Sequence, residues 1–168
     1  GNYSLRWNIL PNNEHIIEIG LKVKTLGWIS FGISPDGYMM NSDIIIAWVD
    51  DNTGQGIIQK RYTTSHHGEP PRLVGYINDD IIYTRQTGDT TYIAFTRQLY
   101  PCNKGYPQAR QFSIGSTNII YAVSPIDPNF DFNPDGILFS GYYANDAFKG
   151  SQTINFFMDD SDVEMNYD

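Results

Sequence analysis

The chain has 168 residues, a length that fits one domain and allows a hydrophobic core without disulfide cross-links. Its 11 lysines and arginines against 19 aspartates and glutamates give a net charge of −8, which argues against a nucleic-acid partner bound through its phosphates. No apolar run approaches the roughly 20 residues that a transmembrane helix needs, and the start of the chain resembles neither a signal nor a transit peptide. We therefore expect a mature or excised module.

The amino-acid composition favours an all-β fold. Aromatic residues make up 14% of the chain and charged residues only 18%, below the roughly 25% of ordinary soluble domains. Tyrosine, phenylalanine, isoleucine and threonine suit half-buried pleated strands, and 15 glycines and 9 prolines supply the turns between them. The one cysteine, Cys102, excludes an internal disulfide framework and a cysteine-rich zinc site.

Short strand-like segments follow one another along the chain, with turn residues between them and no helical period. Residues 15–24 alternate most clearly, because Ile17, Ile19 and Leu21 fall on one face. Residues 43–49 are apolar on both faces, which predicts a central strand. A series of about ten strands predicts an all-β, antiparallel two-sheet β-sandwich, immunoglobulin-like in architecture. The expected strands are residues 3–9, 15–24, 28–33, 43–49, 56–63, 80–85, 90–96, 114–124, 136–141 and 153–158.

Two loops and a tail complete the expected domain organisation. Residues 64–71 and 127–136 are rich in proline, glycine and short polar residues, which predicts loops. Residues 159–168 hold five acidic residues and little apolar pattern, which predicts an acidic tail or linker. The β-sandwich domain itself is expected to span residues 1–158.

Two stretches in the first third of the chain resemble the DOMON family: Gly-Trp-Ile-Ser-Phe-Gly-Ile-Ser at 27–34 and Met-Asn-Ser-Asp-Ile-Ile-Ile-Ala-Trp-Val-Asp at 40–50. Arg-Tyr at 61–62, Leu-Tyr-Pro-Cys at 99–102 and Lys-Gly-Ser-Gln-Thr-Ile-Asn-Phe at 149–156 continue the likeness. This family includes the N-terminal β-sandwich of dopamine β-hydroxylase-like monooxygenases and the cytochrome domain of cellobiose dehydrogenase. The resemblance implies a β-sandwich that binds haem b, binds other ligands such as sugars, or carries a structural metal. The 168 residues hold no histidine-rich copper core, so hydroxylase activity is not carried over.

The resemblance also allows the haem hypothesis to be examined on particular residues. Haem-binding members hold the iron between a methionine before the central strand and a histidine on a late strand, and Met40 occupies the methionine position. Ser140 stands where the histidine is needed, and no histidine follows His67. A serine hydroxyl is a poor ligand for haem iron, so we expect Met40 to pack as an ordinary loop residue.

Resemblance to the monooxygenase branch implies a metal site made of Asp43, the main-chain carbonyls of Ile44 and Arg61, and Asp80. Two carboxylates and two carbonyls form a hard oxygen shell, which suits calcium or sodium rather than zinc or copper. Asp79 is the alternative to Asp80 as the second carboxylate. The competing interpretation of Asp43 is a turn cap that accepts hydrogen bonds from local backbone N–H groups.

The remaining candidate residues carry less specific patterns. His66, His67 and Glu69 suggest a site, but adjacent side chains of an extended chain point to opposite sides and no third ligand accompanies them, so we expect exposed loop histidines. The resemblance implies a disulfide from Cys102 to a segment outside this chain, with a buried free thiol as the alternative. Asn2-Tyr3-Ser4 is an N-glycosylation sequon.

Together these observations predict a non-catalytic, extracellular binding or architectural module of a larger secreted or surface protein, with a structural calcium site. The expected partners are neighbouring domains or other extracellular proteins, and not nucleic acid. A haem b electron-transfer domain is the first alternative. A carbohydrate-binding module is the second, with Trp28, Tyr142, Tyr143 and Phe148 as the available aromatic platforms.

Overall fold

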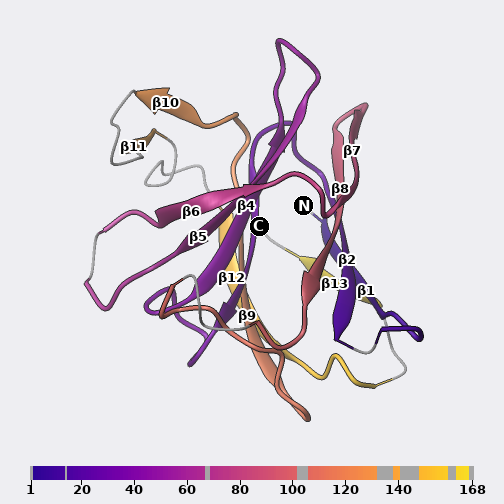
Figure 1. The fold of residues 1–168 in the computed structure, drawn as a ribbon. Coiled ribbons are helices and arrows are strands. Elements are labelled where there is room, and N and C mark those ends of the chain that lie inside the picture. Colours follow the sequence, from indigo (N-terminus) through magenta and orange to yellow (C-terminus); the bar gives the residue numbers. More distant parts are fainter. Residues whose placement is uncertain are drawn as a thin grey trace.

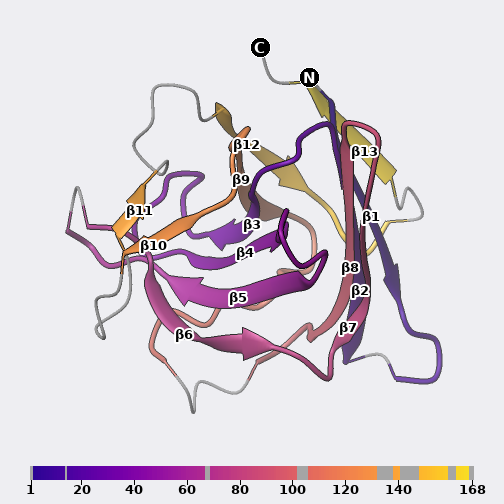
Figure 2. The ribbon, with the colours of Figure 1, turned by 90° about the horizontal axis from the view of Figure 1, so that it is seen from above.

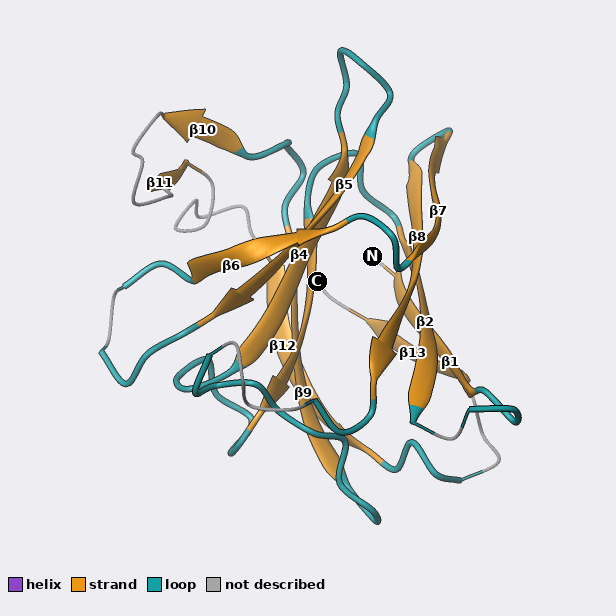
Figure 3. Ribbon diagram, viewed as in Figure 1, coloured by secondary structure: helices purple, strands orange, loops and turns teal. Residues whose placement is uncertain are grey.

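The computed structural model describes residues 2–13, 15–66, 69–101, 106–131, 138–140, 148–158 and 162–166. Strands dominate this described part, which contains no helix, and they form two antiparallel sheets that pack face to face (Figures 1 and 3). The predicted all-β sandwich is therefore confirmed. Within the same residues, no helix is long and apolar enough to cross a membrane.

The first sheet has five strands in the order β13-β1-β2-β8-β7. Both terminal segments of the chain contribute to it, because the last strand pairs with the first (Figure 2). The strands are β13 (Asp162–Asn166), β1 (Asn2–Ile9), β2 (Ile16–Val23), β8 (Thr90–Gln98) and β7 (Ile81–Thr87).

The second sheet has six strands in the order β12-β9-β3-β4-β5-β6. Its strands are β12 (Phe148–Ile154), β9 (Thr117–Val123), β3 (Ile29–Ser34), β4 (Asp43–Val49), β5 (Gly56–Tyr62) and β6 (Arg72–Ile77). A separate two-stranded pair, β10 (Asn129–Asp131) with β11 (Leu138–Ser140), lies on the side of this sheet that faces away from the five-stranded sheet (Figures 1 and 2).

The main core lies between the two sheets and follows from the alternation of the strands. Ile17, Ile19 and Leu21 of β2 all point into it, as their spacing predicts, while the residues between them remain partly accessible. Two hydrogen bonds from ring groups connect the layers: the Tyr3 hydroxyl donates to the Ser30 carbonyl at 2.9 Å, and Trp7 Nε1 donates to the Phe156 carbonyl at 3.0 Å. Burying these rings therefore leaves neither polar group unsatisfied.

Strand β4 is central in its sheet and is buried over its whole length, as its apolar sequence predicts. Ile45, Ala47 and Val49 belong to the main core. Ile44, Ile46 and Trp48 point to the opposite face, where they form a second apolar cluster. Both faces of this sheet are therefore hydrophobic around β4.

Four sequence expectations need correction. Residues 162–166, expected in an acidic tail, form β13, because Val163 and Met165 alternate with the acidic residues and Met165 is buried. The edge strand β6 falls in a segment where no strand was expected, and β10 falls within an expected loop. The last strand of the six-stranded sheet is β12 at Phe148–Ile154 and not residues 153–158.

Candidate functional site

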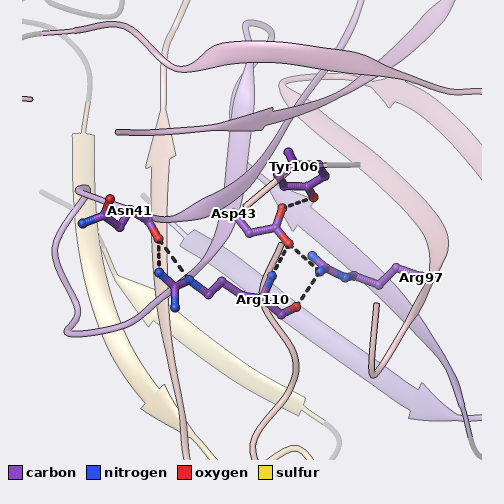
Figure 4. Close-up of polar contacts among 5 residues, drawn as sticks. All are labelled: Asn41, Asp43, Arg97, Tyr106 and Arg110. Atoms are coloured by element: carbon purple, nitrogen blue, oxygen red, sulfur yellow. Dashed lines mark hydrogen bonds and ion pairs between the residues drawn. The ribbon is translucent and has the colours of Figure 1, made fainter. Parts of the chain in front are cut away.

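Asp43 opens β4 at the end of the sandwich where the chain crosses from β8 to β9. Its side chain is only 3% exposed, and both carboxylate oxygens accept hydrogen bonds (Figure 4). Oδ2 accepts from Arg97 Nη2 at 2.9 Å and from the Arg110 backbone N–H at 3.0 Å. Oδ1 accepts from the Tyr106 hydroxyl at 2.7 Å. One carboxylate of the six-stranded sheet thus holds β8 of the other sheet and the crossover segment together.

Two arginines converge on this carboxylate from different directions. Arg97 is 10% exposed, forms the ion pair, donates a further hydrogen bond to the Arg110 carbonyl at 3.2 Å, and lies over the Phe112 ring. Arg110 turns its side chain the other way, and its Nε and Nη2 donate to the Asn41 carbonyl at 3.0 and 2.8 Å. Asn41 has a φ of 54°, a left-handed conformation that asparagine tolerates better than most residues.

Tyr106 completes the network from the crossover segment. Its ring stacks on Tyr62 with the centroids 5.8 Å apart, and its hydroxyl donates to Asp43. Burial raises the pKa of Tyr106, and the Asp43 charge and hydrogen bond raise it further. The phenol therefore stays protonated at neutral pH and serves as a donor to the carboxylate.

Protein donors satisfy both carboxylate oxygens of Asp43 in this structure. Both oxygens already accept from protein donors, and the Arg97 guanidinium supplies the positive charge that a cation would bring. Asp79 and Asp80 are exposed, and the backbone carbonyl of Asp80 accepts the Thr96 N–H. No group of three histidine, cysteine or acidic side chains suited to a metal occurs among the described residues. The calcium site stays a prediction.

The outer face of the six-stranded sheet carries a second candidate site. In most antiparallel sandwiches the outward face of a sheet is polar, whereas here Trp28, Ile44, Ile46 and Trp48 are buried on it and apart from the main core. Four partly buried hydrophobic residues pack against them, namely Ile57, Leu73, Ile120 and Ala122. We call these eight residues the outer apolar face.

A buried guanidinium borders the outer apolar face. Arg61 of β5 is the register partner of Ile44 and is fully buried, and its neighbour on the same face, Gln59, pairs with Ile46. Gln59 Oε1 accepts from Arg61 Nε and Nη2 at 2.8 and 2.6 Å, and the Pro71 carbonyl accepts from Nη1 at 2.7 Å. Burial lowers the pKa of Arg61 to about 10, so the group remains charged at neutral pH.

The other residues singled out from the sequence are dispersed. Met40 is partly buried in the loop before β4. His66 is exposed and lies beside Thr64, whose hydroxyl donates to Glu69 at 2.9 Å. Asn2 is exposed at the start of β1. His67, Cys102, Tyr142, Tyr143 and the side chain of Ser140 lie outside the described residues.

The sequence left open which of the four candidate aromatic rings are exposed. Trp28 is fully buried in the outer apolar face, so its ring is not offered to a sugar on the surface. Phe148 is 38% exposed, which leaves part of its ring accessible.

Sequence reasoning missed Arg97, Tyr106 and Arg110. The alternation of β8 could have identified Arg97, because it falls on the same inward face as Ile93 and Phe95. A charged side chain on that face needs a buried counter-charge. No comparable pattern marks Tyr106 or Arg110, because both lie in an irregular segment more than 60 positions from Asp43.

The DOMON domain family matches residues 1–124 of this chain. The chain belongs to the DOMON family. Among curated proteins, MOXD1 homolog 1 of Drosophila melanogaster is 29% identical over 129 residues, which are 76% of this chain and 18% of that protein. DBH-like monooxygenase protein 1 of Homo sapiens is 30% identical over 105 residues, which are 61% of this chain and 16% of that protein. The chain thus spans less than a fifth of the length of these relatives.

Two solved structures share the fold of this DOMON domain. The cytochrome domain of Myriococcum thermophilum cellobiose dehydrogenase has a TM-score of 0.59 and 18% identity, covering 84% of this chain and 66% of that chain. The cytochrome b domain of pyranose dehydrogenase from Coprinopsis cinerea has a TM-score of 0.56 and 16% identity, covering 92% and 74%. The family resemblance stated from the sequence is confirmed.

Proposed function

We propose that this DOMON domain is a non-catalytic binding and architectural module of a larger secreted or surface protein. The observation that carries the proposal is the outer apolar face. Four hydrophobic residues are buried and four are partly buried on the outward side of this sheet, although the main core of the sandwich is complete without them. The four partly buried members remain in part accessible, and accessible apolar surface suits contact with a ligand or with a neighbouring domain.

The nature of the relatives supports this role. The matched region is 16–19% of the length of the relatives named MOXD1 homolog or DBH-like monooxygenase protein. In a protein of that size the domain has neighbours in the same chain, and a rigid β-sandwich can hold them at a fixed distance. Asp43 and its donors keep the two sheets of that scaffold together.

Hydrogen exchange tests the proposal in the parent protein. We expect the β3, β4 and β5 amides to exchange more slowly in the full-length protein than in the 168-residue chain, because a neighbour covers the outer apolar face. The β1 and β2 amides, in the other sheet, serve as the internal control. Equal protection of β3–β5 in the two proteins would contradict a role for this face in domain contact.

Haem b electron transfer is the second candidate, favoured by the two cytochrome domains that share the fold. Met40 is the one axial ligand that the sequence supplies at a matching position, and no histidine follows His67. We therefore expect no stoichiometric haem after incubation of the purified chain with haem b. An absorption spectrum checks this expectation: a low-spin Soret band that disappears in Met40→Ala would establish the cytochrome function instead.

The calcium site, the glycan on Asn2 and the external disulfide of Cys102 are carried forward as parts of the same proposal. All three suit a secreted or surface protein. Mass spectrometry of the native, unreduced protein tests two of them: Asn2 should carry a glycan, and Cys102 should resist alkylation until the protein is reduced. Calcium binding to Asp43 requires Arg97 to move away, and its test is given in the Discussion.

A further inference from the structure

A polar cleft of about 540 Å³ lies at the crossover end of the sandwich. Its walls come from the end of β3, from residues 101, 109–111, 113 and 116 between β8 and β9, and from the start of β9. The lining is mostly polar and includes Ser34, Arg110, Gln111, Ser113, Ser116 and Asn118. These residues are distinct from the outer apolar face and from Arg61, and the cleft shares Arg110 with the hydrogen-bond network of Asp43.

Some polar groups in the cleft are already used by the fold. The Ser34 hydroxyl donates to the Tyr38 carbonyl at 2.6 Å, and Asn118 Oδ1 accepts from the Thr153 hydroxyl at 2.8 Å. Gln111, Ser113 and Ser116 differ, because they are exposed and their side chains make no hydrogen bond within the described part of the chain. An amide and two hydroxyls, each able to donate and to accept, therefore remain for a ligand.

Arg110 gives the cleft a positive charge. The Asp43 carboxylate is neutralised by Arg97, and Arg110 contacts it only through its backbone N–H. The Arg110 guanidinium donates through Nε and Nη2 to one neutral carbonyl, that of Asn41, and forms no ion pair with any described residue. An arginine has five N–H donors, so donors and an uncompensated charge remain on this wall.

We propose that the cleft binds a small, hydroxyl-rich ligand with a single oxyanion, such as a sugar acid. The oxyanion pairs with Arg110, because guanidinium and carboxylate groups match in charge and geometry. The neutral hydroxyls of the ligand exchange hydrogen bonds with Gln111, Ser113 and Ser116. A net charge of −8 repels long polyanions, so the ligand carries one charge and not many.

Nuclear magnetic resonance titration of the chain with glucuronate tests the proposal, with the backbone amides of residues 111, 113 and 116 as the reporters. We expect saturable shifts with glucuronate, at least about tenfold weaker binding of glucose, which lacks the charge, and weaker binding of inorganic phosphate, which lacks the hydroxyls. Arg110→Gln should weaken glucuronate binding about tenfold. Arg85→Gln removes an exposed arginine on β7 and should leave binding within about twofold of the original.

The exposed residues Gln111 and Ser116 provide variants that do not depend on the fold. Gln111→Ala and Ser116→Ala should each weaken glucuronate binding about threefold while the melting temperature stays unchanged. Absence of saturable shifts, or equal losses in Arg110→Gln and Arg85→Gln, would overturn the site. Phosphate binding as tight as glucuronate, unaffected by Ser116→Ala, would overturn the hydroxyl-rich ligand.

Discussion

The two ends of β4 both lie beside a buried or partly buried aspartate, and the two are stabilised differently. At the start of the strand, both oxygens of Asp43 accept hydrogen bonds and Arg97 neutralises the charge. Beyond the other end, Asp127 Oδ2 accepts from the Asp51 N–H at 3.0 Å, but its buried Oδ1 has no partner among the described residues. At the first end the carboxylate is neutralised and links the two sheets; we call Asp43 and its three donors, Arg97, Tyr106 and Arg110, the clasp. At the second end the carboxylate of Asp127 is incompletely stabilised.

The pKa values reflect this difference at the second end. Burial raises the pKa of Asp127, and the negative charges of Asp51 and Asp50 raise it further against the opposing effect of the Asp51 N–H. Asp50 is partly exposed and accepts hydrogen bonds from Thr53 and Asn52, which lower its pKa. The acidic residues beyond β4 are therefore partly paired with turn donors and partly in repulsion with one another.

The largest expected effect comes from removing the clasp. Asp43→Ala leaves the Arg97 guanidinium buried without its counter-charge, so we expect the free energy of unfolding to fall by about 3–5 kcal/mol. Urea unfolding followed by tryptophan fluorescence measures the change. Asp80→Ala, at an exposed aspartate, is the matched control and should stay within about 0.5 kcal/mol. A loss below about 1 kcal/mol for Asp43→Ala would mean that the clasp is not a stabilising contact.

The second prediction concerns whether a calcium ion can take the place of the Arg97 guanidinium beside Asp43. Arg97→Gln removes the positive charge beside Asp43, and calcium binding only to the folded state would then stabilise it by about 2.7 kcal/mol at a hundredfold excess over the dissociation constant. We expect calcium to raise the melting temperature of Arg97→Gln more than that of the original chain, with magnesium less effective. The double variant Asp43→Asn with Arg97→Gln should not respond. If the original chain and Arg97→Gln each melt at the same temperature in calcium as in a chelator, the calcium site is excluded.

The third prediction concerns Gly27, where the chain before β3 contacts the segment that follows β9. The Trp28 N–H donates to the Ile126 carbonyl at 3.2 Å, and a Cβ on Gly27 would overlap the Ile126 backbone. Backbone atoms cannot rotate away as a side chain can, so Gly27→Ala should destabilise the domain by about 1–3 kcal/mol. Gly75→Ala is the control, because a Cβ there meets nothing within 4 Å. Equal melting temperatures for the two variants would show that this crossing of the chain is adaptable.

The smallest effect is expected from Asp127→Asn. Because the pKa of Asp127 is raised in the folded state, its protonated carboxyl group contributes stability at low pH that is lost as the pH rises through that pKa. The amide is uncharged at every pH and can still accept the Asp51 N–H. Asp127→Asn should therefore be slightly more stable than the original at pH 7, by a few tenths of a kcal/mol, and lose this advantage below about pH 4. Thermal melting across this pH range checks the sign, and a destabilised variant at pH 7 would reverse it.

The sequence predicted the fold well where alternation was regular. The pattern of β2 and the continuous apolar run of β4 were sufficient to place a half-buried and a central strand. Strand β6 was missed because it is an edge strand with a glycine and a bulge opposite Lys60 and Arg61, which interrupt the period of two. Strand β13 was missed because its acidic residues dominate the composition although Val163 and Met165 keep the alternation.

The candidate site was predicted less completely, for a physical reason. An aspartate at the start of an apolar strand must be neutralised if it is buried, and Asp43 is indeed buried. Its partners, however, come from positions 54, 63 and 67 residues away. Only the packing of the two sheets brings them together, so composition and local spacing could not identify them.

The pairing of β13 with β1 has a mechanical consequence. Asn2 lies opposite Asn166 and Arg6 opposite Asp162, so the two strand ends nearest the termini sit side by side. A force that pulls Asn2 and Asn166 apart would load the hydrogen bonds of this ladder one after another, as in a zipper, and not all at once. Tension through the flanking polypeptide would therefore peel β13 away first and expose Leu5 and Tyr3, while the six-stranded sheet and its outer apolar face stay intact.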